Sequence, residues 1–189
     1  DKVSYKGYTV FTDSVDGSGE KEGVYYQYFD ADLGRPVVNE GEDGLQKLDY
    51  ALYKAEQEGI KLLITFTNNW EAFGGMGQYV QWAKLAGENV SGHDDFYTNE
   101  TIKGWYKDYI KTLLNHENVY TGVKYKDDPT IFSWELANEP RCESDAGCEN
   151  NTVVKWATEM SAYVKSIDNN HMLAVGDEGF YNYGYNDFP

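Results

Sequence analysis

From Asp43 onward, the hydrophobic pattern of this chain alternates between helical and strand-like segments. Apolar residues at 45, 48, 52 and 55 recur at the helical period and share one face, which predicts a helix that Asp43-Gly44 opens and Gly59 ends. Ile60–Thr67 follows as a near-continuous apolar run, typical of a strand buried on both faces of a parallel sheet.

The same order recurs twice more along the chain. A polar, aromatic, Gly-rich loop over 68–99 contains a short helix around Tyr79–Leu85. The next helix directs Ile102, Tyr106, Tyr109, Ile110 and Leu113 inward, and a later one does so with Val153, Ala157, Met160, Val164 and Ile167. Each is followed by a predicted strand, Thr130–Ala137 and His171–Gly176 respectively.

The first 42 residues lack this rhythm and are predicted to form an irregular loop region, with the βα units over 43–189 in the same single domain. Tyr8–Phe11 and Val24–Phe29 form a weak candidate pair of strands there.

Alternation of helix and strand predicts a parallel sheet, and polar residues follow each predicted strand. These residues are Asn68, Asn69 and Trp70, then Asn138 and Glu139, then Asp177 and Glu178. Ligands of parallel α/β folds bind at the carboxyl ends of the strands, so we expect all three groups to face one site. No Gly-rich phosphate fingerprint opens a helix, which favours an α/β (β/α)₈ TIM barrel over a doubly wound nucleotide-binding fold.

Composition narrows the possible partners of the 189-residue chain. Its net charge of −16 argues against nucleic acid and against an anionic membrane surface. No apolar run approaches about 18 residues, the length that spans a bilayer. Aromatic residues make up 16% of the chain. Aromatic side chains in polar stretches of sequence suit a solvent-filled binding cleft. The alternative is that they reflect the general use of tyrosine in β-rich proteins. The aromatic residues in question are Tyr25, Tyr26, Tyr28, Trp70, Tyr79, Tyr181, Tyr183 and Tyr185.

Glu139 is the leading candidate for acid–base chemistry. It ends a buried strand beside Asn138, and partial burial favours the neutral form of a carboxyl that donates a proton. The alternative is a carboxylate that caps a helical turn. Glu178 and Asp177 either complete an acid–base pair or bind sugar hydroxyls, and Trp70 is either a sugar platform or a rim aromatic.

Other chemistries find little support in the sequence. His93, His116 and His171 are scattered without zinc-site spacing, and G-x-S-x-G is absent. The doublets Asp94-Asp95 and Asp127-Asp128 are interpreted as solvated surface rather than as calcium ligands. We therefore expect neither a metal nor a cofactor.

Cys142 and Cys148 lie close together, either as free thiols or as a disulfide that contributes about 2 kcal/mol. Three glycosylation sequons, at Asn89, Asn99 and Asn150, together with this pair favour a secreted, extracellular protein.

The segment WELANEPRC, Trp134 to Cys142, resembles the acid/base segment of glycoside hydrolase family 5, and in particular its fungal-type endo-β-1,4-mannanases. Segments Asp43–Trp70 and Val153–Phe180 and the pair Gly74-Gly75 agree with the family in order and spacing. NEP is common to many related cellulases, whereas NEPRC, FTNNW and GDEG together are more specific to mannanases.

The resemblance implies a role for each candidate residue. Glu139 acts as general acid/base, Asn138 contacts the sugar 2-hydroxyl, and Arg141 holds sugar on the leaving-group side. Trp70 and Glu178 line the cleft, with Asn68 and Asn69 among the substrate-binding residues, and Cys142 and Cys148 form a local disulfide.

The resemblance also implies that the chain is an internal fragment, holding roughly strands three to five of the barrel with their helices. A retaining enzyme needs a nucleophile glutamate about 5–5.5 Å from the acid, and in the family it follows the seventh strand, outside this chain. The implied substrate is β-mannan, with the rest of the parent chain completing the barrel. A cellulase or exo-β-mannosidase of the same family and a non-catalytic glycan-binding barrel remain as alternatives.

Overall fold

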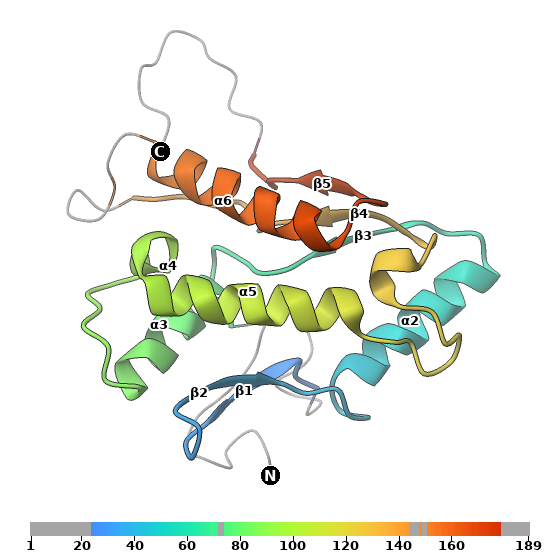
Figure 1. The fold of residues 1–189 in the computed structure, drawn as a ribbon, viewed down its shortest axis with the longest axis horizontal. Helices are drawn as coiled ribbons and strands as arrows, with labels where there is room; N and C mark the ends of the chain where they lie inside the picture. The colour runs from blue at the N-terminus through green and yellow to red at the C-terminus, as the bar shows by residue number, and fades with distance from the viewer. Residues whose placement is uncertain (1–23, 72–73, 144–147, 149–150, 179–189) are drawn as a thin grey trace, which may run out of the picture.

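The computed structural model describes residues 24–71, 74–143, 148 and 151–178 (Figure 1). Its helices are α2 (Leu45–Gln57), α3 (Gly75–Leu85), α4 (Asp95–Thr98), α5 (Glu100–Asn115), the 3₁₀ turn η1 (Tyr125–Asp127) and α6 (Thr152–Ile167). Its strands are β1 (Gln27–Asp30), β2 (Arg35–Val38), β3 (Leu62–Thr65), β4 (Ile131–Glu135) and β5 (Met172–Ala174). In the described ranges, no helix is long and apolar enough to cross a membrane.

The sheet has three parallel strands in the order β3-β4-β5, as the alternating pattern predicts. Each strand follows one of the long helices α2, α5 and α6. Backbone pairing continues beyond the regular strands, since Phe66 N donates to Glu135 O and Leu136 N to Ala174 O, both at 2.9 Å. The carboxyl ends of all three strands therefore stay aligned.

The two faces of this sheet differ in burial. Ile64 and Trp134 are buried, and the Trp134 ring stacks on Phe66 at 5.2 Å between centroids. On the opposite face, large apolar side chains at 63, 132 and 172 are about half exposed (51%, 56% and 52%). Within the described residues, the segment expected to be buried on both faces, Ile60–Thr67, thus buries Ile64 and Phe66 and leaves Leu63 half exposed.

The core between the sheet and the helices is rich in aromatic rings. Phe96, Tyr106 and Trp156 pack on one another with centroids 5.3–5.9 Å apart, and the Tyr106 hydroxyl donates to Leu136 O at 2.5 Å. Tyr25, Tyr26 and Tyr79 are also buried, contrary to the expectation that they line a wet cleft. Polar neighbours in sequence do not prevent burial of a tyrosine ring, because its hydroxyl can find a partner inside the protein.

An antiparallel hairpin lies in the N-terminal region that was expected to be irregular. β1 pairs with β2, and Asp30 Oδ1 accepts hydrogen bonds from Asp32 N and Leu33 N at 2.9 and 3.1 Å in the connecting turn. Gly34 completes the turn with a φ of +64°. The strand expected over Val24–Phe29 is thus present in part, with residues 35–38 as its partner, whereas Tyr8–Phe11 lies outside the described residues.

Candidate functional site

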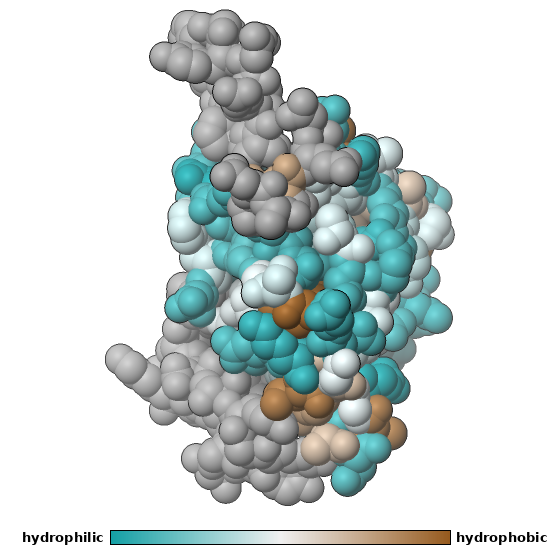
Figure 2. Space-filling model, turned by 90° about the vertical axis from the view of Figure 1, so that its left-hand side faces the viewer, coloured by the Kyte–Doolittle hydropathy of each residue, from teal (hydrophilic) through white to brown (hydrophobic). Residues whose placement is uncertain are grey.

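The polar residues that follow the three strands come together at one edge of the sheet. Asn68 and Asn138 form a parallel bridge, with Asn69 N donating to Asn138 O at 3.0 Å. Glu139 N donates to Gly176 O at 2.9 Å, which attaches the end of β4 to the end of β5. On the side of the molecule that Figure 2 shows, the coloured residues are mostly hydrophilic, with a few hydrophobic groups among them.

Two asparagines hold the first two strand ends in register. The Asn138 amide donates to Asn68 Oδ1 at 3.0 Å, and the same oxygen accepts Trp70 N at 3.2 Å. Gly75, at a φ of +60°, packs so tightly that a Cβ there would lie 2.2 Å from Trp70 O. The close approach of the loop explains why a glycine stands at this position.

Glu139 occupies a left-handed backbone conformation, with a φ of +53°. A non-glycine residue rarely adopts this region, and such strain is often found at functional sites. Its half-buried side chain accepts a hydrogen bond at Oε2 from Trp70 Nε1 at 2.6 Å. Trp70 itself is 43% exposed, so the carboxyl and the indole together border solvent.

Arg141 links the remaining predicted residues. Its guanidinium lies over the Trp70 ring, 5.3 Å from the centroid, and forms an ion pair with Glu178. Its backbone N donates to Asn69 Oδ1 at 3.2 Å. Glu178 is thus held by a cation, while Asp177 is exposed beside it.

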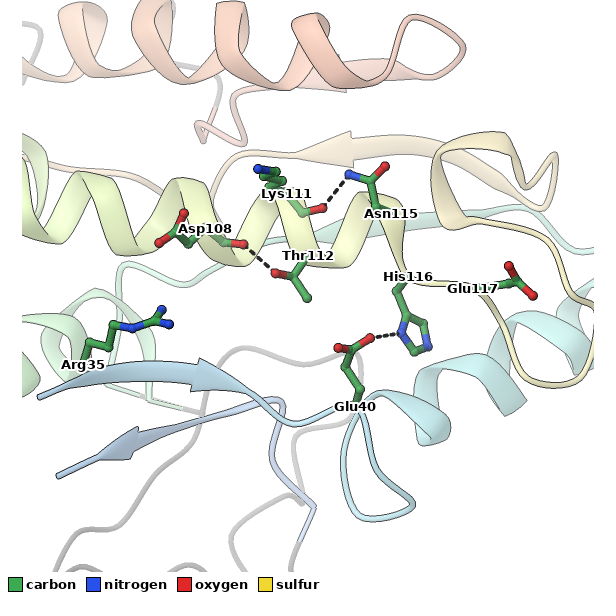
Figure 3. Close-up of a pocket in the computed structure, with 8 residues that line it drawn as sticks. All are labelled: Arg35, Glu40, Asp108, Lys111, Thr112, Asn115, His116 and Glu117. Atoms are coloured by element: carbon green, nitrogen blue, oxygen red, sulfur yellow. Dashed lines mark hydrogen bonds and ion pairs between the residues drawn. The ribbon is translucent and has the colours of Figure 1, made fainter. Parts of the chain in front are cut away.

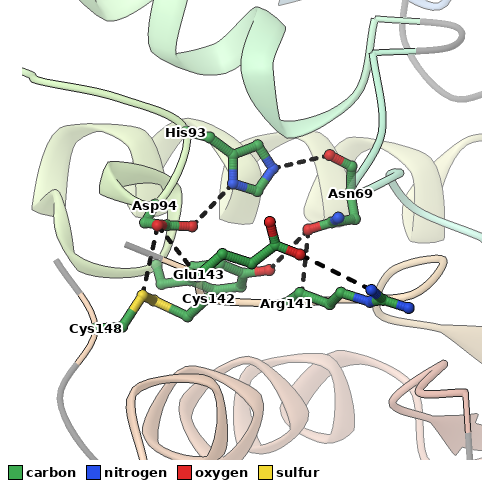
Figure 4. Close-up of a disulfide and its surroundings, with 8 residues drawn as sticks. Asn69, His93, Asp94, Arg141, Cys142, Glu143 and Cys148 are labelled. Atoms are coloured by element: carbon green, nitrogen blue, oxygen red, sulfur yellow. Dashed lines mark hydrogen bonds and ion pairs between the residues drawn. A yellow bond between two sulfur atoms is a disulfide. The ribbon is translucent and has the colours of Figure 1, made fainter. Parts of the chain in front are cut away.

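Cys142 and Cys148 form a disulfide, as the family resemblance implies (Figure 4). Asp94 anchors this loop, because its Oδ2 accepts Glu143 N at 3.3 Å and lies 3.4 Å from Cys148 Sγ. His93 bridges the loop to the site: its Nδ1 lies 3.0 Å from Asp94 Oδ1 and its Nε2 2.8 Å from Asn69 O.

His93, Asp94 and Tyr97 are the residues near the site that the sequence did not indicate. Asp94 is buried, so the interpretation of Asp94-Asp95 as a solvated doublet is wrong for its first member. Tyr97 donates to Asn69 Oδ1 at 3.4 Å, and burial raises the pKa of its hydroxyl. No periodicity or spacing marks these residues, because their contacts with Asn69 and Glu143 join positions far apart in sequence.

The structure also bears on possible metal binding. Asp94, Cys142 and Cys148 are the one group of three potential ligands that lie close together among the described residues. Both sulfurs are bonded to each other, so neither is a thiolate that binds a metal.

A separate hollow of about 670 Å³ lies between β2 and the C-terminal half of α5 (Figure 3). It is lined by side chains of both signs of charge, including the basic Arg35 and Lys111 and the acidic Asp108 and Glu117. It contains none of the residues predicted for the site.

The strand-end site combines groups that suit a neutral polyol. It offers a carboxyl, two amides, a guanidinium and a partly exposed indole face, which together can hydrogen-bond hydroxyls and stack on an apolar sugar face. The indole hydrogen bond goes to Oε2 of Glu139, and a half-buried carboxyl of this kind is a group that can exchange a proton with a ligand.

Known proteins resemble this chain strongly. The family described as GH family 5 beta-mannosidase-like matches residues 34–188. Mannan endo-1,4-beta-mannosidase 1 of Oryza sativa subsp. japonica is 50% identical over 143 residues, covering 76% of this chain and 33% of that protein. Mannan endo-1,4-beta-mannosidase 7 of Arabidopsis thaliana is 53% identical over 140 residues, covering 74% of this chain and 32% of that protein. The chain thus spans about a third of the length of these curated relatives.

Solved structures agree with the sequence relatives. The endo-1,4-beta-mannanase of Rhizomucor miehei has a TM-score of 0.79 and 42% identity, covering 98% of this chain and 53% of that one. The endo-beta-1,4-mannanase of Thermotoga petrophila has a TM-score of 0.68 and 51% identity, covering 80% of this chain and 32% of that one. Because these relatives come from plants, a fungus and a bacterium, they do not distinguish a fungal from a plant type. The chain belongs to glycoside hydrolase family 5, in its β-mannosidase-like group.

Proposed function

We propose that this chain is part of a secreted endo-β-1,4-mannanase in which Glu139 is the general acid/base. The single observation that carries the proposal is the Glu139 carboxyl at the end of β4, oriented by Trp70 and flanked by Asn138 and Arg141. The family membership supports a glycosidase reaction, and the names of the relatives support mannan as substrate.

In the proposed reaction, cleavage of the glycosidic bond begins with proton transfer from Glu139. Glu139 gives its proton to the glycosidic oxygen while the bond from that oxygen to C1 breaks and the bonding electrons remain on the oxygen. A second carboxylate, about 5–5.5 Å from the first in retaining enzymes, forms a bond to C1. Water then attacks C1 with Glu139 as general base, which releases the second carboxylate. The nucleophile is expected on a later strand of the full-length protein.

A complete (β/α)₈ barrel is the architecture in which these strands are stable. Leu63, Phe132 and Met172 on the open sheet face need a cover, and the other strands of a barrel would supply it. The chain covers about a third of its relatives, which is consistent with β3, β4 and β5 as barrel strands three to five.

Secretion is supported by two features. Disulfides persist in oxidising compartments, and Cys142 and Cys148 are paired. Sequon residue Asn89 is exposed, whereas Asn99 caps α5 by accepting Ile102 N at 3.0 Å through its side-chain oxygen.

Glu139→Gln in the full-length protein tests the assignment. The substituted amide keeps an oxygen for the Trp70 indole, so folding and binding of manno-oligosaccharide are expected to persist while turnover of mannan falls about 10²–10⁴-fold. Glu56→Gln, at an exposed position of α2, is the matched control and is expected to retain full turnover. Near-normal hydrolysis of mannan by Glu139→Gln would exclude Glu139 as the acid.

The wild-type protein also separates the remaining alternatives. A cellulase would hydrolyse carboxymethylcellulose faster than mannan, and an exo-enzyme would release mannose from the first time points. A glycan-binding barrel without catalysis would bind mannan and leave its chain length unchanged.

A further inference from the structure

Trp70 makes a directed polar contact that a sugar-stacking platform does not require. Its Nε1 lies 2.6 Å from Glu139 Oε2, a short distance for a hydrogen bond from a neutral N–H to a carboxyl oxygen. In the part of the chain that the structure describes, the Trp70 indole donates a side-chain hydrogen bond to the Glu139 carboxyl. The contact joins the end of β3 to the end of β4.

The indole ring is held from two directions. Behind it, the Trp70 backbone is fixed by the Asn68 side chain and by the close approach of Gly75 to Trp70 O. Above it, the Arg141 guanidinium lies 5.3 Å from the ring centroid, and Glu178 holds that guanidinium in an ion pair. The N–H of a ring fixed in this way can hold its acceptor in place.

The backbone conformation of Glu139 does not by itself fix the position of its carboxyl group. At a φ of +53° the residue is outside regular strand or helix geometry, and the carboxyl projects from the end of β4 with its side chain only half buried. A glutamate side chain has three rotatable bonds, so it samples several positions unless a partner restricts it.

We propose that Trp70 is the positioning residue that decides which oxygen of Glu139 carries the catalytic proton. Indole nitrogen donates and never accepts, and the carbonyl oxygen of a neutral carboxyl is a better hydrogen-bond acceptor than its hydroxyl oxygen, so the short Nε1–H contact favours Oε2 as the carbonyl oxygen. The proton therefore resides on Oε1, the oxygen that transfers it to the glycosidic oxygen. The inference rests on the proposed function of Glu139 and deepens it.

The test is a comparison of leaving groups in the full-length enzyme. With a poor leaving group the glycosidic oxygen needs the proton, whereas 2,4-dinitrophenolate departs without it. Trp70→Phe removes the N–H and keeps an aromatic ring beneath Arg141. Trp105→Phe makes the same chemical change on α5, away from the site, and is the matched control.

We expect Trp70→Phe to lower kcat/KM on mannotetraose by about 10–100-fold, a part of the full general-acid effect. The loss on 2,4-dinitrophenyl β-mannobioside is expected to stay within about 3-fold, because that substrate needs no acid. Trp105→Phe should change neither value. An equal loss of kcat/KM on both substrates, caused by a higher KM, would identify Trp70 as a binding platform alone and overturn the proposal. Unchanged kcat/KM on both substrates would also overturn it.

Two further variants keep the outcome interpretable. If Trp70→Phe does not fold, as judged by circular dichroism, 3-benzothienylalanine at position 70 keeps the ring shape and replaces the N–H with sulfur. Glu139→Gln separates the two hypotheses. If it shows the leaving-group pattern and Trp70→Phe does not, only the positioning role fails. If Glu139→Gln hydrolyses mannotetraose normally, the proposed function itself fails.

Discussion

A buried carboxylate in α2 provides the sharpest stability prediction. Asp49 is fully buried; its Oδ1 accepts the Tyr125 hydroxyl at 2.6 Å, and both of its oxygens lie 3.1 Å from His116 Nε2. The other ring nitrogen of His116, Nδ1, lies 2.8 Å from Glu40 Oε2 (Figure 3). Carboxylates only accept hydrogen bonds, so both contacts form together only when the imidazole carries two protons.

The charge of His116 sets the pH dependence of this cluster. Burial opposes the charged ring, but hydrogen bonds with Asp49 and Glu40 outweigh it and raise the pKa of His116 above 6.5. A raised folded-state pKa means that the stabilisation is fully present below the unfolded pKa of about 6.5. It is lost as the pH rises through the folded-state pKa.

Asp49→Asn removes the charge and keeps the shape. The amide oxygen of the introduced asparagine can still accept a hydrogen bond from the Tyr125 hydroxyl. Its NH₂ group faces the Nε2–H of charged His116, and two hydrogen-bond donors then lie opposite each other with no acceptor between them. We expect the free energy of unfolding to fall by about 3–5 kcal/mol at pH 5.5, which is the typical cost of removing one partner of a buried ion pair. At a second pH, above the folded-state pKa of His116, the neutral ring can accept from the introduced NH₂, and the loss shrinks to about 1 kcal/mol.

Urea unfolding of the full-length protein at both pH values measures the effect. Asp108→Asn, at an exposed position of α5, is the matched control and should change stability by less than about 0.5 kcal/mol. Equal losses for Asp49→Asn at the two pH values, or a loss below about 1 kcal/mol at pH 5.5, would refute the reasoning.

Two further predictions concern the strand-end site. Gly176→Ala should lower stability by roughly 2 kcal/mol or more and reduce mannan turnover, because a Cβ would lie 1.8 Å from Ala137 O. Gly122→Ala has a similar positive φ with no atom within 4 Å, so thermal unfolding should show a smaller loss, and equal losses would contradict the overlap argument. Replacing Cys142 and Cys148 by serine should cost about 2 kcal/mol in urea unfolding, and two titratable thiols in the native wild-type protein would contradict the disulfide.

Long helices and the strands after them were predictable because their signal is local. The helical face of residues 45, 48, 52 and 55 matches the buried face of α2, and Gly59 ends the segment at a φ of +68°. The short helix expected around Tyr79–Leu85 begins earlier, at Gly75, since the glycines at 74 and 75 reverse the loop directly before it.

Burial and pairing over long distances were not predictable. The hairpin of β1 and β2 has a short strand containing proline, a weak local signal. Asp94 looks like a surface residue in sequence but is buried, and its contacts include Glu143 and Cys148, more than 45 positions later in the chain.

The sequence by itself determined the order of helices and strands, the polar residues at each strand end and the resemblance to family 5. These features follow from the spacing of hydrophobic residues and from short sequence motifs, and both are properties of residues close together in the chain. Only the tertiary structure decided that Trp70 meets Glu139, that Arg141 lies over that indole and that His93 bridges Asn69 to Asp94. Such contacts join residues distant in sequence, and their geometry exists only once the parallel strands align.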